Sequence, residues 1–191
     1  HDFDICRLFS SPTWTGSAVL LSSQWTLGGG STWQAGVLSG CFRAHARCAL
    51  VAAVLPFDPV RNEVILIEQF RVGAWSAKWP QPWLLECVAG MVEPGESPEE
   101  MVRREAREEA GCEITALAPI ARYFSTPGAC SEKVDLFCGC TDASGLGGIH
   151  GLAEEGEDIR ATVWTLTDAL TLLDTGQICN SMTLIALQWL A

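Results

Sequence analysis

Basic residues are scarce in this sequence. Only 12 lysines and arginines stand against 23 aspartates and glutamates, which gives a formal net charge of −11 at pH 7. A strongly acidic protein repels both the phosphate backbone of nucleic acids and the surface of an anionic membrane. We therefore expect neither nucleic acid nor a membrane as the partner. A phosphorylated small molecule stays compatible if metal ions mediate its binding.

Long apolar runs and paired metal-binding cysteines are also missing. No apolar run is long enough to cross a bilayer, and the first residues lack the basic start of a secretion signal. The nine cysteines are scattered, without the two Cys-x-x-Cys units that would suggest zinc. We interpret them as reduced thiols, mostly in the core of a cytoplasmic protein.

The chain has enough apolar residues to fold and divides into two parts. Hydrophobic residues make up 48% of the 191 positions and charged residues 18%, and the length fits about one domain. Residues 1–48 are rich in Ser, Gly and Trp and poorly patterned, with weak strand candidates at 17–21 and 33–38. We predict a β-rich N-terminal extension over 1–48 and the main domain over 49–191.

Alternating short strands and helices are predicted along the main domain. Residues 50–55 and 63–70 form a predicted hairpin around turn chemistry at 56–59, and a loop over 75–82 leads to a strand at 83–89. Strands follow at 113–124 and 133–141, and a long loop covers 142–156. In the tail, Thr167 or Asp168 is predicted to cap a helix that runs to about 173, and a second helix is predicted from 181 to 190.

The acidic stretch over 90–112 contains a helix with both ends specified. Ser97 can cap it, a proline follows in the first turn, Glu100 completes a capping box, and Gly111 suits a left-handed stop. The pattern predicts a helix from Pro98 to Ala110.

Three glutamates of this helix share one face, because residues three and four apart are neighbours on a helix. They are Glu105, Glu108 and Glu109. One interpretation is a solvated charged face, balanced by nearby arginines. The other is a site for a hard divalent cation, since Mg²⁺ prefers carboxylate oxygens and usually bridges to substrate phosphates.

The spacing of the stretch favours the cation site. It reads Gly, five residues, Glu, seven residues, Arg-Glu, an apolar residue, one residue, Glu-Glu, one residue, Gly and an apolar residue. These positions are filled by Gly90, Glu96, Arg104, Glu105, Ala106, Glu108, Glu109, Gly111 and Cys112. A pattern with this many fixed positions is specific. The chain resembles a Nudix hydrolase.

Within that family the chain resembles the bacterial ADP-ribose pyrophosphatase group. A proline about fifteen residues beyond the box is associated with ADP-ribose hydrolysis, and Pro127 lies fifteen residues after Cys112. Further matching stretches are 54–71, 82–97, 144–160 and 185–190, and the resemblance as a whole extends from about Leu50 to the C-terminus.

The resemblance implies a fold, an activity and partners. The fold is α/β, a Nudix α/β/α sandwich with a mixed sheet between helices. The activity is Mg²⁺-dependent hydrolysis of the pyrophosphate of ADP-ribose to AMP and ribose 5-phosphate, with Mn²⁺ able to substitute. Such enzymes form a homodimer through an N-terminal sheet. The open alternatives are a pyrophosphatase for another nucleoside diphosphate derivative, such as a sugar nucleotide or dinucleoside polyphosphate, and a non-catalytic nucleotide-binding module.

The resemblance also assigns roles to residues of this chain. Attack on a pyrophosphate needs a water deprotonated near neutral pH, and a carboxylate beside metal ions can accept its proton. The implied base is Glu155, or Glu154 if the loop register differs by one, with Glu108 and Arg104 in support. The implied metal ligands are Glu105, Glu109, Glu157 and the carbonyl of Ala89. The implied substrate contacts are Arg71, Glu86, Met91, Pro127, Gly128, Ser131 and Glu132, and the loop is shaped by Gly90, Glu96 and Gly111.

Two points stay open at the level of the sequence. Glu86 lies among apolar neighbours and fits an exposed surface carboxylate as well as a substrate or metal contact. The family typically has Phe-Glu-Arg just before the first core strand, where this chain has Cys41 to His45. Read one base later, codons for that segment can encode Val-Phe-Glu-Arg, so we consider a reading-frame error upstream of Ala49.

Overall fold

The computed structural model describes residues 50–128, 130–152 and 157–191. The predictions for residues 1–48, including the β-rich extension, the reading-frame error and the N-terminal dimer sheet, lie outside these ranges. The predicted base Glu155 and its alternative Glu154 also lie outside them.

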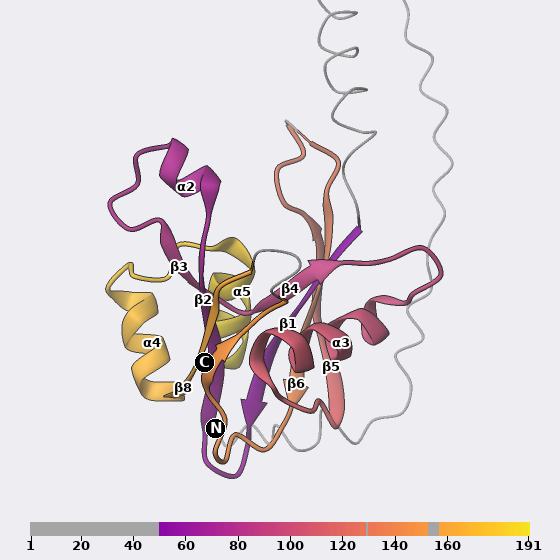
Figure 1. Ribbon diagram of the computed structural model, residues 1–191, viewed down its shortest axis with the longest axis vertical. Coiled ribbons are helices and arrows are strands. Elements are labelled where there is room, and N and C mark those ends of the chain that lie inside the picture. The colour runs from indigo at the N-terminus through magenta and orange to yellow at the C-terminus, as the bar shows by residue number, and fades with distance from the viewer. Residues whose placement is uncertain (1–49, 129, 153–156) are drawn as a thin grey trace, which may run out of the picture.

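Eight described strands form one mixed sheet (Figure 1). The order is β5-β6-β1-β2-β8-β7, with β3 beside β2 and β4 beside β1, and only β1 and β6 run parallel among these pairs. The strands are β1 (Leu50–Asp58), β2 (Glu63–Phe70), β3 (Trp83–Glu86), β4 (Val88–Met91), β5 (Ala116–Phe124), β6 (Lys133–Cys140), β7 (Gly148–His150) and β8 (Ile159–Thr165).

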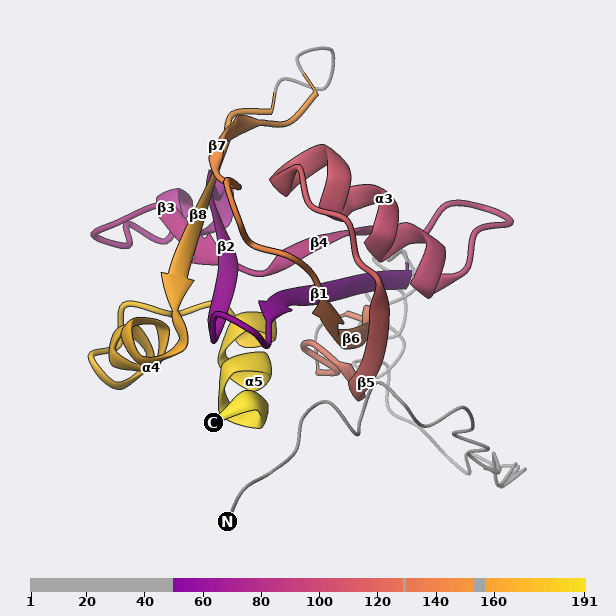
Figure 2. The ribbon, with the colours of Figure 1, turned by 90° about the horizontal axis from the view of Figure 1, so that it is seen from below.

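Helices cover both faces of the sheet (Figure 2). Alternate residues of a strand point to opposite faces, so Val54 and Ile65 pack with helix α3 (Pro98–Ala110), whereas Leu55 and Leu66 pack on the opposite side. That side carries α4 (Leu166–Asp174) and α5 (Ser181–Leu190), and a short helix α2 (Val72–Ser76) follows β2. The predicted α/β/α sandwich is confirmed.

The helix α3 forms where its caps predict it. The Ser97 side chain accepts from the backbone N–H of Glu100, and the Glu100 side chain accepts in return from the backbone N–H of Ser97. Gly111 ends the helix in the left-handed conformation with φ 63°. Both predicted ends are confirmed.

The single strand predicted over 83–89 is wrong, because the chain breaks at Cys87 into β3 and β4. The strands β1 and β2 pair only near Asp58 and Glu63 and then diverge. β3 continues along β2 and β4 along β1, filling the opening. At the break, the backbone N–H of Cys87 donates to Thr183 Oγ1 at 2.8 Å, so it leaves the strand ladder and binds α5.

The ends of β1 and α4 also differ from the prediction. β1 continues through Asp58, whose carboxylate accepts from the backbone N–H groups of Val60 and Arg61 and so shapes the turn that follows. α4 begins at Leu166 and is capped by Thr165 rather than by Thr167 or Asp168, because Thr165 Oγ1 accepts from the backbone N–H of Asp168.

Three connections were also predicted differently. The loop over 142–156 contains β7, which pairs with β8. β5 starts at Ala116 rather than 113, and α2 extends into the loop predicted from Trp75. No helix in the described ranges is both long and apolar enough to span a bilayer.

Candidate functional site

The candidate site forms where α3 passes over β4. Glu105 and Glu109 lie one turn apart on α3 and face the backbone of Ala89 and Gly90. The backbone N–H of Ala89 donates to Glu109 Oε2 at 3.3 Å. A Cβ atom at Gly90 would overlap the Glu105 carboxylate, so only glycine lets strand and carboxylate come this close.

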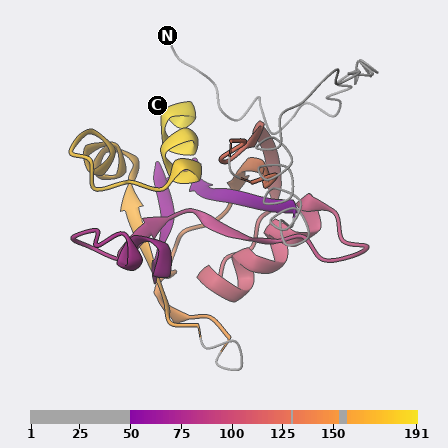
Figure 3. The ribbon, with the colours of Figure 1, turned by 90° about the horizontal axis from the view of Figure 1, so that it is seen from above.

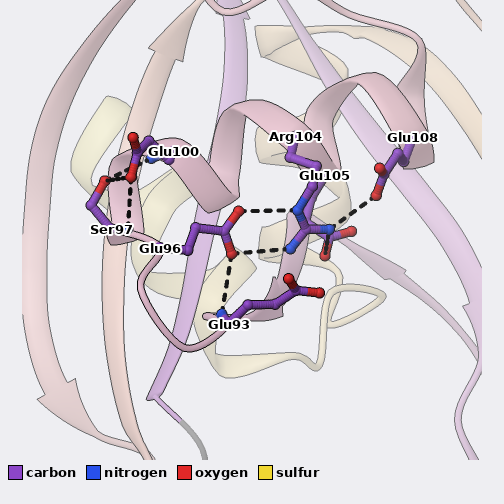
Figure 4. Close-up of polar contacts among 7 residues, drawn as sticks. All are labelled: Glu93, Glu96, Ser97, Glu100, Arg104, Glu105 and Glu108. Carbon is purple, nitrogen blue, oxygen red and sulfur yellow. Dashed lines mark hydrogen bonds and ion pairs between the residues drawn. The ribbon is translucent and has the colours of Figure 1, made fainter.

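Arg104 joins three carboxylates beside this contact (Figure 4). Its Nε donates to Glu96 Oε1 at 3.0 Å, and its Nη1 donates to Glu105 Oε1 at 2.9 Å and to Glu108 Oε2 at 3.0 Å. Glu96 also accepts from the backbone N–H of Glu93, which fixes the loop before α3. The Arg104 hydrogen bond lowers the pKa of Glu96, and the three carboxylates together raise the pKa of Arg104.

Glu109 carries the most perturbed carboxyl of the helix. Its side chain is only 3% exposed, and burial followed by the negative charge of Glu105 raises its pKa to about 8. Burial also raises the pKa of Glu105 against the opposing effect of Arg104. Among the described residues, no salt bridge reaches Glu109. Within the part of the chain that the structure describes, the pair therefore lacks full charge compensation.

The donor set fits a hard divalent cation in part. Glu105, Glu109 and the backbone of Ala89 offer oxygen atoms of the kind that Mg²⁺ takes. Within the described ranges, no three Asp, Glu, His or Cys side chains are close enough to hold a metal by themselves. A bound ion would complete its coordination with backbone, water or phosphate oxygens, as Mg²⁺ usually does.

The β7–β8 connection brings Glu157 to the same place. The hairpin lies beside the C-terminal end of α3 in both Figure 2 and Figure 3, and the backbone N–H of Gly151 donates to the Glu108 carbonyl at 3.2 Å. The Glu157 charge contributes to the raised pKa values of Glu105 and Glu109. Its Oε2 accepts from the backbone N–H of Leu152 at 3.0 Å, which holds the carboxylate in place.

Glu86 is a buried carboxylate, so the exposed alternative is wrong. It is 1% exposed, and its Oε2 accepts from Arg71 Nε at 2.9 Å and Nη2 at 2.5 Å. Its Oε1 accepts from Asn180 Nδ2 at 2.9 Å. Burial would lower the pKa of Arg71, but the Glu86 hydrogen bonds and charge raise it. Asn180 was missed in the sequence, although an Asn directly before an apolar helix is a capping signal.

Among the described residues, no hydrogen bond or ion pair joins the remaining predicted substrate residues to these groups. Met91 ends β4 with 66% of its surface exposed. Pro127, Gly128, Ser131 and Glu132 lie in the β5–β6 turn, which Ser125 closes by donating its backbone N–H to the Glu132 carbonyl at 3.2 Å. Within the described residues, no hydrogen bond or ion pair joins this turn to Glu86 or α3.

The fold and the site together describe one class of protein. It is an α/β/α sandwich in which the carboxylates of one helix lie against a glycine of a neighbouring strand. The model of the NUDIX domain family matches residues 48–177. The chain belongs to the NUDIX domain family. Use of a divalent metal ion is general among Nudix ADP-ribose pyrophosphatases.

Named relatives of this chain are pyrophosphatases. It is 48% identical over 148 residues to the ADP-ribose pyrophosphatase of Escherichia coli (strain K12), covering 78% of this chain and 68% of the relative. It is 44% identical over 143 residues to the ADP-ribose pyrophosphatase of Haemophilus influenzae, covering 73% and 65%. It is 32% identical over 139 residues to the GDP-mannose pyrophosphatase of Cronobacter sakazakii, covering 73% and 72%.

The fold also matches a solved structure. The structure described as "Crystal structure of ADP compounds hydrolase" superposes with a TM-score of 0.58 at 24% identity, covering 75% of this chain and 72% of that one. At this identity the likeness supports the fold.

Proposed function

We propose that this chain hydrolyses the pyrophosphate of ADP-ribose to AMP and ribose 5-phosphate. The observation that carries the substrate is the 48% identity, over 78% of the chain, to the ADP-ribose pyrophosphatase of Escherichia coli. The chemistry is supported by a pair of carboxylates, buried Glu109 and largely buried Glu105, that lie against a strand backbone and lack full charge compensation from the described residues.

We propose Mg²⁺ as the metal, with Mn²⁺ as a substitute. Two or three such ions would be held between them by Glu105, Glu109, Glu157 and the Ala89 carbonyl. A bound divalent ion offsets phosphate charge and makes a coordinated water more acidic.

The surrounding side chains prepare these ligands. Arg104 fixes Glu105 and Glu108 through its Nη1 and anchors itself on Glu96, so the carboxylates are oriented before substrate arrives. Glu108, four residues after Arg104 on the helix, supports the site by accepting from Arg104 Nη1. Glu155, outside the described residues, is the proposed acceptor of the water proton.

The substrate side is proposed around Arg71 and Glu86. Two of the three guanidinium nitrogens of Arg71 donate to Glu86, and within the described residues Nη1 makes no hydrogen bond. A guanidinium held in this way can offer its remaining N–H groups to a phosphate or ribose oxygen. Met91 and the turn residues Pro127, Gly128, Ser131 and Glu132 are proposed as further contacts. A cytoplasmic homodimer is proposed as the working form.

A second candidate substrate comes from the GDP-mannose pyrophosphatase relatives. Their identity to this chain is 32% over 73% of its length, against 48% over 78% for the first group. A guanosine sugar nucleotide carries the same pyrophosphate, so the metal site alone does not choose between the two. The choice depends on the groups that hold the nucleoside and the sugar.

The test is turnover at micromolar protein with ADP-ribose or GDP-mannose and Mg²⁺. We expect AMP from ADP-ribose, with a larger kcat/KM than for GDP-mannose, and loss of product on adding EDTA. Preference for GDP-mannose would replace the substrate proposal. Binding of ADP-ribose without product formation would instead identify a non-catalytic nucleotide-binding module.

A further inference from the structure

Glu86 and β4 are both anchored by the first turn of α5, on the face of the sheet opposite α3. Asn180 precedes this helix and donates through Nδ2 to Glu86 Oε1 at 2.9 Å. Its Oδ1 accepts from the backbone N–H groups of Met182 at 3.0 Å and Thr183 at 3.2 Å. One side chain therefore caps the helix and holds a buried carboxylate.

Thr183 extends the connection to β4. Its side chain is fully buried, and its Oγ1 lies 3.3 Å from Asn180 Oδ1 and accepts from the backbone N–H of Cys87 at 2.8 Å. Cys87 is the residue at which the chain passes from β3 to β4. Two residues later, the backbone N–H of Ala89 donates to Glu109.

We propose that Asn180 and Thr183 are positioning residues for the pyrophosphatase site, with Asn180 aiming Arg71 through Glu86 and Thr183 setting the β3–β4 break that places Ala89 against Glu109. The inference rests on the proposed function and assigns to α5 a role in both halves of the site.

The physical argument is that a buried carboxylate must have all its oxygens satisfied. Arg71 is 39% exposed in its side chain and has many rotamers, so its orientation depends on a fixed acceptor. Glu86 is fixed only if its other oxygen is also bound, and within the described residues that partner is Asn180. Loss of the Asn180 amide leaves Glu86 Oε1 buried without a donor, so Glu86 and Arg71 shift together.

The first test replaces Asn180 by Asp. Asp is as good a helix cap as Asn, so α5 keeps its cap, but an oxygen now faces Glu86 in place of the amide donor. We expect the KM for ADP-ribose to rise about tenfold, the worth of one hydrogen bond to a charged group, with kcat changed less than about threefold. Metal-free titration of ADP-ribose by calorimetry should weaken in parallel.

Two controls separate positioning from stability and charge. Thr165→Ala removes the side-chain cap of α4, a helix that makes no hydrogen bond to Glu86. This variant should have a lower Tm and an unchanged KM. Gln177→Glu adds the same negative charge at an exposed site three residues before Asn180 and should also leave KM unchanged. If either control raises KM as much as Asn180→Asp does, the positioning role is wrong.

A double-mutant cycle tests whether Asn180 acts through Arg71. In an Arg71→Ala background, Asn180→Asp should change KM by less than about twofold, because the group that it aims is gone. An undiminished effect in that background overturns the proposed route. If the wild type itself gives no product from ADP-ribose, the proposed function fails, and the calorimetric arm with its Arg71→Ala partner still decides the inference.

Thr183 is tested by removing only its hydroxyl. Thr183→Val keeps the shape and leaves the Cys87 N–H without an acceptor, so kcat should fall about tenfold as Ala89 and Gly90 shift. Thr183→Ser should restore the acceptor and most of kcat. If the Val variant does not fold, the Ser variant is compared with the wild type in metal titrations instead. Equal affinity for the metal then supports the role of the hydroxyl. Full kcat in a folded Val variant, or a Ser variant with the Val defect, contradicts it.

Discussion

Glu109 is the residue at which burial and charge conflict most within the described chain. It lies 3% exposed beside Glu105, and its only hydrogen bond to a described residue comes from a backbone N–H. Glu109→Gln keeps the shape and that hydrogen bond but removes the charge that would bind a cation. We expect kcat to fall by roughly 100-fold, the effect of losing one group of a preorganised site, with the fold retained. The matched control is Glu99→Gln on the exposed first turn of α3, which should keep full Mg²⁺-dependent activity.

The same carboxyl predicts how stability depends on pH in the metal-free protein. Its folded pKa of about 8 lies above the ordinary value of 4.5, so the protonated form is favoured by folding. That contribution is fully present below pH 4.5 and is lost as the pH rises towards 8. Glu109→Gln should therefore have the same Tm as the wild type near pH 4.5 and a higher Tm at pH 8. The corresponding gain in free energy of unfolding at pH 8 is on the order of a few kcal/mol. Thermal melts in EDTA across this range measure it, and a difference that does not vary with pH would contradict the assignment.

Gly90 shows a different constraint, because a side chain there would overlap the present position of the Glu105 carboxylate. Its absent Cβ is what allows Glu105 to reach the β4 backbone. Gly90→Ala should displace that carboxylate and lower kcat by roughly 100-fold with a smaller change in Tm. Gly73→Ala in α2 is the control, because its Cβ would meet no atom within 4 Å. Equal activity of the two variants would show that the close approach of Glu105 to Gly90 is not needed for catalysis.

Among the elements, α3 could be predicted from the sequence because its determinants are local. Ser97, Glu100 and Gly111 lie within one or two residues of the ends that they specify. The division of β3 from β4 could not, because it depends on Thr183, 96 residues further along the chain from Cys87. The burial of Glu86 could not be predicted for the same reason, because its second partner, Asn180, lies 94 residues away in the chain. The helix half of the site was therefore visible in the sequence, and the α5 half was not.

The cap of α3 predicts a measurable stability effect at the element scale. Ser97→Ala removes the acceptor for the Glu100 N–H and one half of the capping box, which should cost about 1 kcal/mol and lower the Tm by about 2–4 °C for a chain of this size. Ser97→Asp retains an acceptor and should keep most of the stability. Differential scanning calorimetry measures both. A Ser97→Ala variant as stable as Ser97→Asp would mean that the cap contributes little.

At the scale of the whole molecule, a buried carboxylate links distant segments where β1 and β2 pair. There Asp58 is 1% exposed and accepts from Val60, Arg61 and Ala143, so it joins the β1–β2 turn to the segment after β6. Burial alone would raise its pKa, but these hydrogen bonds lower it from 3.8 to about 2. This end of the sheet stays closed while β3 and β4 occupy the other end.

Protonation of Asp58 should therefore lower the free energy of unfolding at acid pH. Because its folded pKa is depressed, its contribution is fully present above pH 3.8 and is lost as the pH falls towards 2. Asp58→Asn places an amide donor among backbone donors and should cost about 1–3 kcal/mol at pH 7, a deficit that shrinks between pH 4 and pH 2 as the wild type protonates. Urea unfolding at several pH values measures the deficit. The exposed Asp174→Asn variant is the control and should follow the wild type throughout, since a deficit of equal size there would reflect net charge rather than this contact.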